Sequence, residues 1–142
     1  WRLRAHMAFF VDNLQYYLQV DVLDAQWVAL VQTANQCADF EELVRAHEAT
    51  LGAIHAQCFL QSASVSAALM SIFEQSLELC HLLGDDGGGT PRATVAREFG
   101  KQVSFFVSYL SGVSSPQASQ HLAQLHLRLR FNEFDLSSVG DL

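Results

Sequence analysis

The sequence predicts an all-α protein, an elongated bundle of about five helices with one long helix at its N-terminus. Apolar residues recur every three or four positions along most of the 142 residues, which is the period of one helix face. Half of the residues are hydrophobic and 16% are charged, a balance that suits a folded core and not a disordered chain. The two prolines each stand where a helix would begin.

The longest predicted helix covers residues 1–35, where neither Gly nor Pro interrupts the apolar period. At 1.5 Å per residue it would be about 50 Å long, which is too long for the core of one small compact domain. We therefore expect it to cross a bundle or to pack along a neighbour. Its predicted core stripe consists of Leu3, Met7, Phe10, Leu14, Tyr17, Val20, Leu23, Trp27, Leu30 and Ala34.

Four further helices are predicted from start signals and apolar spacing. Asp39 and Glu42 have the spacing of a capping box at the start of the second helix. Thr-Pro and Ser-Pro pairs, typical of the N-cap and first helical position, begin the last two. The glycine-rich stretch 84–90 predicts a flexible loop. The expected ranges are about 40–60, 63–83, 91–112 and 116–124.

The spacing of apolar residues changes at residues 125–131. Leu125, Leu127 and Leu129 alternate with polar residues, which predicts a short extended segment near the C-terminus. Because a lone strand leaves its backbone groups unpaired, the alternative is that the fifth helix continues through these residues. We expect residues 1–131 to form one helical bundle and residues 132–142 to form a polar, acidic tail.

Composition limits the classes of function. The chain has 15 Asp plus Glu against 8 Lys plus Arg, and this acidity makes a nucleic acid an unsuitable partner. No apolar run is long enough to predict a membrane span, and no secretory signal pattern is present. The chain opens at Trp1, already inside an apolar-periodic segment, so we expect it to be the C-terminal piece of a longer protein.

No constellation of residues predicts catalysis, a metal or a cofactor. His47-Glu48 begins like a zinc-protease motif, but Leu51 stands where the second histidine is needed. The glycine-rich stretch lacks the Lys-Ser/Thr ending of a phosphate loop. The three cysteines include no C-x-x-C pair, so reduced thiols are expected instead of disulfides or a zinc knuckle. They are Cys37, Cys58 and Cys80.

Aromatic side chains are in surplus on the first predicted helix. Phe10, Tyr17 and Trp27 fit its core stripe, whereas Phe9 and Tyr16 fall on other sides. Exposed tyrosine and apolar surface is typical of interfaces. The alternative is that these sides pack against helices that precede this stretch.

This helix also carries a family resemblance. Residues 3–23, and above all 9–17 (Phe-Phe-Val-Asp-Asn-Leu-Gln-Tyr-Tyr), resemble the conserved C-terminal region of the gamma-tubulin complex components, with Trp27 in a further matching place. Residues 127–132 resemble the terminal Leu-Arg-Leu-Asp-Phe-Asn of that family, with Arg130 in place of the usual acid. The glycine-rich stretch and the divergent tail are similar to those of larger members such as the sixth component.

The resemblance implies an elongated helical protein without catalytic activity or a cofactor. The C-terminal half of such proteins binds gamma-tubulin, and the N-terminal half pairs laterally with other components in a hetero-oligomeric ring. The ring displays gamma-tubulin as a template for microtubule nucleation. The implied location is the cytoplasm, at the cytoskeleton, centrosome or other microtubule-organising centre, and spindle pole.

Polar residues of the first helix and of the C-terminal region are the candidate contacts with gamma-tubulin. Asp21 and Asp24 stand at i and i+3, which predicts an exposed acidic patch on one helix face. The alternative is a structural bundle that buttresses the binding domain without touching gamma-tubulin. The candidate partner-binding residues are Asn13, Gln15, Tyr16, Gln19, Asp21, Asp24, Arg128, Arg130 and Asn132.

Overall fold

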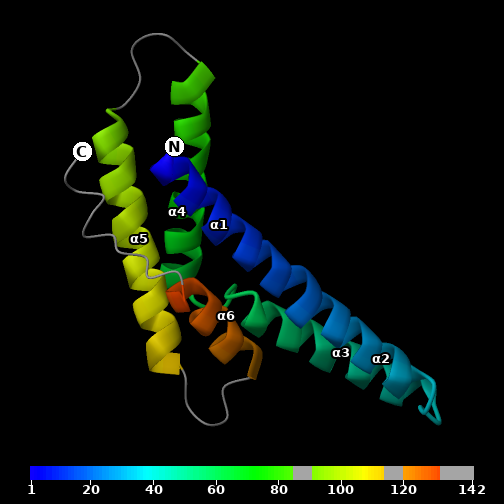
Figure 1. The fold of residues 1–142 in the computed structure, drawn as a ribbon. Coiled ribbons are helices and arrows are strands. Elements are labelled where there is room, and N and C mark those ends of the chain that lie inside the picture. Colours follow the sequence, from blue (N-terminus) through cyan, green and yellow to red (C-terminus); the bar gives the residue numbers. More distant parts are fainter. Residues whose placement is uncertain (85–90, 114–119, 132–142) are drawn as a thin grey trace.

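The computed structural model describes residues 1–84, 91–113 and 120–131, and all of the regular structure in these ranges is helical (Figure 1). This confirms the predicted all-α class. The elements are α1 (Arg2–Tyr16), the π-helix η1 (Tyr17–Asp24), α2 (Ala25–Ala34), α3 (Phe40–Gln57), α4 (Ala63–Gly84), α5 (Arg92–Val113) and α6 (Gln120–Phe131).

The helices form two parts that share one core (Figure 1). α4 and α5 lie side by side, and α1 crosses them at its N-terminal end. α1, η1 and α2 follow one another as a single helical run, which carries α2 away from the α4–α5 pair. α3 returns alongside α2, and we call these two helices the arm. α6 packs against α1, η1 and α5 where the two parts meet.

Aromatic rings form the centre of the core. The Phe10 ring meets the Phe106 ring edge-on at 5.8 Å between centroids, and Phe59 meets Phe106 at 5.2 Å. Tyr17 stacks on Phe59 at 5.8 Å. These four residues come from α1, η1, the α3–α4 connection and α5, so the cluster joins the long helical run to the α4–α5 pair. The other core residues are Met7, Leu14, Val22, Val65, Leu69, Ile72, Leu79, Val95, Phe99, Val103, Leu110, Leu125 and Leu129.

The predicted start of α3 is confirmed in detail. The Asp39 carboxylate accepts a hydrogen bond from the backbone N–H of Glu42 at 2.7 Å, as an N-cap should. The Glu42 carboxylate in turn accepts from the N–H of Ala38 at 2.9 Å. The helix ends at Gln57 because Phe59 has a left-handed backbone (φ 63°), which no helix can include. This residue brings its ring into the core, where it is 4% exposed.

The π-helix η1 corrects the predicted core stripe. A π-helix has a wider turn than an α-helix, so the inward-facing line moves by about one residue across Tyr17–Asp24. Val22 is fully buried, whereas Val20 and Leu23 are 41% and 44% exposed and Trp27 is 65% exposed. The prediction of Trp27 as a core residue was therefore wrong. Beyond η1 the half-buried line toward α3 consists of Gln26, Leu30 and Ala34.

The predicted extended segment at 125–131 is also wrong, because α6 runs through it. Leu125 and Leu129 are fully buried, one helical turn apart, and Leu127 between them is 65% exposed. The leucine alternation therefore combines a buried line at i, i+4 with one exposed leucine. Of the predicted loop at 84–90, Gly84 is the last residue of α4, and residues 85–90 lie outside the described residues. The Ser115-Pro116 start and the tail 132–142 also lie outside them.

Candidate partner-binding site

Arg128 on α6 joins two residues of the long helical run. Its Nη1 atom donates a hydrogen bond to Asp21 Oδ2 at 3.2 Å, within an ion pair. Its guanidinium also lies over the Tyr16 ring, with Cζ 4.5 Å from the ring centroid, in a cation–π contact. Three of the residues predicted from the sequence are thus brought together from positions 107 residues apart.

Burial makes this ion pair different from an ordinary surface pair. The Asp21 side chain is 10% exposed and that of Arg128 is 31% exposed. The wide turn of η1 points Asp21 inward, and α6 presents Arg128 to it because the adjacent Leu129 is held in the core. The predicted exposed acidic patch of Asp21 with Asp24 is therefore wrong: Asp21 is buried and paired, and only Asp24 is exposed.

A second set of contacts ties the π-helix to the end of α3. The Tyr17 hydroxyl donates to the backbone carbonyl of Gln57 at 3.1 Å, and the Gln26 amide donates to the Gln57 side chain at 3.4 Å. Burial, followed by the nearby Cys58 thiol and Asp21 carboxylate, raises the pKa of the Tyr17 hydroxyl well above its usual range. The hydroxyl consequently remains protonated and remains a donor.

The other predicted contact residues differ in burial. Asn13 is half-buried, and its amide donates to the Phe9 carbonyl at 2.8 Å within the helix. Tyr16 is 48% exposed, so its ring faces both Arg128 and solvent. Asn132 lies outside the described residues. The exposed polar and charged members are Gln15, Gln19, Asp24 and Arg130.

Sequence reasoning missed the exposed apolar surface of the arm. Neither α2 nor α3 contains a buried residue. Trp27 and Val28 on α2 are 65% and 53% exposed, and Phe40 and Leu51 on α3 are 77% and 53% exposed. The apolar spacing between Val20 and Val31 did indicate an apolar side of the helix. Because we read that spacing as an unbroken α-helix, we placed Val20, Leu23 and Trp27 in the core.

Metal-binding, disulfide and membrane-spanning features are absent from the part of the chain that the structure describes. Among the residues described, no group of three or more His, Cys, Asp or Glu side chains could hold a metal ion. The three cysteines are free thiols. No helix within the described ranges is long and apolar enough to cross a membrane. The exposed aromatic, apolar and polar groups of the helical run and arm are typical of a protein-recognition surface.

Comparison with known proteins identifies the class of helical protein. Residues 1–134 match the family described as "Gamma tubulin complex component C-terminal". The chain belongs to this family of gamma-tubulin complex components. This confirms the resemblance seen in the sequence.

The individual relatives are fourth and third components, and the fourth components match over more of the chain. The chain is 38% identical to Gamma-tubulin complex component 4 of Mus musculus and of Homo sapiens over its whole length, which is 22% of each relative. It is 37% identical to component 4 of Arabidopsis thaliana over 94% of the chain and 19% of the relative. Human component 3 is 33% identical over 54% of the chain and 9% of the relative. The similarity to a large sixth component finds no support in these matches.

Proposed function

We propose that this chain is the gamma-tubulin-binding part of a gamma-tubulin ring complex subunit, which positions gamma-tubulin as a template for microtubule nucleation. The observation that carries the proposal is the family match over residues 1–134. The chain spans about a fifth of the length of the relatives it matches, so the activity of the whole complex enters only as part of this proposal.

The structure supports a binding role for the η1 region. The half-exposed Tyr16 ring is held in place by Arg128, which itself is fixed by Asp21. An aromatic side chain fixed in this way presents contact area at little further cost in conformational entropy. Gln19 and Asp24 are exposed further along η1 and would help to orient a partner.

The proposed assembly is hetero-oligomeric, with other gamma-tubulin complex components as lateral neighbours of the full subunit. The subunit acts by holding gamma-tubulin in position, not by catalysing a reaction, and needs no cofactor of its own. Neither nucleic acid nor membrane is a proposed partner. The proposed location is the cytoplasm, at the cytoskeleton, the centrosome or another microtubule-organising centre, and the spindle pole.

A pull-down of purified gamma-tubulin by the chain tests the proposal. The variant Gln19→Lys with Asp24→Lys raises the charge of the exposed side of η1 by three positive units and should weaken capture. Its matched control, Glu74→Lys with Ser104→Lys, adds the same charge at exposed positions of α4 and α5 and should bind like the wild type. Circular dichroism verifies that both variants are folded.

The outcomes separate binding from buttressing. Capture by the wild type and the control but not by the η1 variant supports the proposed site. Equal capture by all three proteins would show that η1 is not the binding site and that the contact with gamma-tubulin lies elsewhere on the chain. Absence of capture by the wild type overturns the binding function and leaves the buttressing role.

A further inference from the structure

The arm is a pair of helices with several exposed apolar side chains. α2 and α3 touch along a half-buried line, yet neither helix has a buried residue. Short helices obtain most of their stability from packing an apolar face, and a two-helix layer covers only one side of each helix. The remaining apolar side chains of the arm therefore form a surface suited to further packing.

Exposed apolar residues at the end of η1 and on α2 stand at a regular spacing, and we call them the ridge. Leu23 of η1 and Trp27 and Val31 of α2 stand four residues apart and are 44%, 65% and 39% exposed. They extend about 12 Å from the end of η1 along α2, at 1.5 Å per residue. A ridge at i, i+4, i+8 packs into the groove between the side-chain rows of another helix. The shape of this surface fits a helix laid along α2.

The charges on the arm define what that helix must carry. Between Asp24 and Gln57 the chain has five carboxylates and a single arginine, Arg45. All five carboxylates are at exposed positions, with Asp24 next to Leu23 in the chain and the other four at or after the start of α3. A partner whose apolar stripe is flanked by Lys or Arg would meet this acidic rim with opposite charge. A partner with an acidic or neutral rim would lose that attraction.

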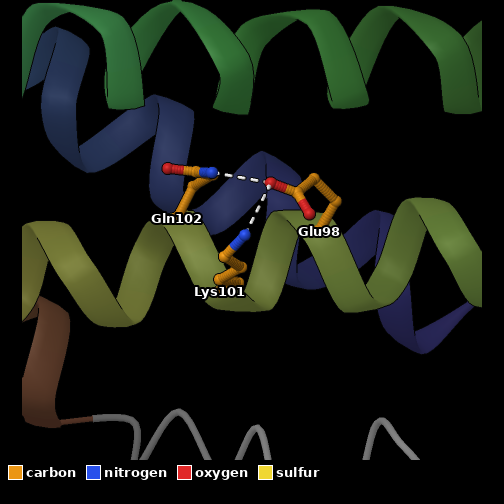
Figure 2. Close-up of polar contacts among 3 residues, drawn as sticks. All are labelled: Glu98, Lys101 and Gln102. Carbon is orange, nitrogen blue, oxygen red and sulfur yellow. Dashed lines mark hydrogen bonds and ion pairs between the residues drawn. The ribbon is translucent and has the colours of Figure 1, made fainter.

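Other occupants fit this surface poorly. The tail 132–142 has three acidic residues and no basic one, so it would be repelled by the arm. A second copy would bring a net charge of -7 and an equally acidic arm. Lys101 on its α5 is already paired with Glu98, whose carboxylate also accepts from Gln102 (Figure 2). Anionic lipid and nucleic-acid phosphates carry the same sign of charge as the arm.

We propose that the arm is a docking site for an amphipathic helix of another polypeptide, with its apolar stripe on Leu23, Trp27 and Val31 and a rim of Lys or Arg facing the arm's carboxylates. This goes beyond the proposed function, because it assigns a second surface and requires no contact with gamma-tubulin.

Trp27 serves as the reporter in the experiment. The chain has two tryptophans, so Trp1→Phe leaves Trp27 as the single source of tryptophan fluorescence. This protein is titrated with a helical Leu/Lys peptide of about 18 residues, long enough to span the ridge. A Leu/Glu peptide with the same apolar face is the charge control. Leu23→Gln with Val31→Gln removes the ridge, and Leu77→Gln with Leu83→Gln, exposed on α4, is its matched control.

The expected result is a saturable blue shift of Trp27 emission with the Leu/Lys peptide and none with the Leu/Glu peptide. The ridge variant should bind about tenfold more weakly or worse, since two apolar side chains no longer contribute. The α4 control should bind like the parent. Equal binding of both peptides, or unchanged binding by the ridge variant, would overturn the proposal. It is also overturned if phosphatidylserine vesicles, or a rise in protein concentration alone, shift the emission more strongly than the Leu/Lys peptide.

Discussion

Replacement of Arg128 by Met tests the physical basis of the η1 region most directly. Met keeps much of the aliphatic length of Arg but removes its charge, its hydrogen bond to Asp21 and its contact with the Tyr16 ring. The Asp21 carboxylate would then remain in a place where its side chain is 10% exposed, without its ion-pair partner. We expect a clear loss of folding stability.

The magnitude follows from the geometry. A hydrogen bond to a charged group contributes about 1.5–3 kcal/mol, and an exposed cation–π contact about 0.5–1 kcal/mol. Solvent screens part of the first term because the Arg128 side chain is 31% exposed. The expected loss is thus about 2 kcal/mol. For a chain of this size, that corresponds to a fall in the unfolding midpoint of roughly 5–8 °C.

Urea and thermal unfolding followed by far-ultraviolet circular dichroism provide the measurement. A double-mutant cycle with Asp21→Asn should give a coupling free energy of about 1 kcal/mol or more between the two residues. Arg130→Met, an exposed change two residues away, is the control and should be close to neutral. A loss below about 0.5 kcal/mol for Arg128→Met, or additive effects in the cycle, would refute the ion pair as a stabilising contact.

Two further predictions concern the core and the pH dependence. Phe59→Ala should lose about 3–5 kcal/mol in urea unfolding because a buried ring is removed. Phe59→Gly should be more stable than Phe59→Ala, since glycine adopts the left-handed backbone at this position freely. The reverse order would show that the left-handed backbone at position 59 does not cost stability. Burial, with Arg130 nearby, lowers the pKa of His126 from 6.5, so the unfolded chain binds more protons than the folded one below that pH. Stability should therefore fall as the pH drops below about 6.5. His126→Gln should show a smaller fall in unfolding midpoint between about pH 7.5 and 5; an equal fall would assign the effect to other groups.

A local signal in the sequence predicted the start of α3 correctly. The capping box at Asp39 and Glu42 acts through hydrogen bonds between residues three or four positions apart, so its outcome depends little on the rest of the fold. The stripe from Met7 to Tyr17 was also recognisable, because an ordinary α-helix carries it.

The misassigned residues share a physical cause. No local pattern marks the π-helix at Tyr17–Asp24, whose Tyr17 and Asp21 contact Gln57 and Arg128 from distant segments. The apolar spacing continues beyond η1, so the sequence predicted Trp27 as a core residue. In α6, alternation and helical spacing coincide over so few residues that only packing distinguishes them. Packing is likewise what makes Asp21 a buried ion-pair partner instead of a surface acid.

The wide turn at η1 also has a consequence for changes in chain length. The wide turn holds about one residue more than an α-helical turn, so deletion of a single residue within Tyr17–Asp24 would give an ordinary α-helix and keep Val22 and Gln26 on the inner side. If the same residues instead formed an unbroken α-helix with no deletion, α2 would rotate by about 100° about its axis relative to α1. The number of residues in this turn thus determines which side of α2 faces α3.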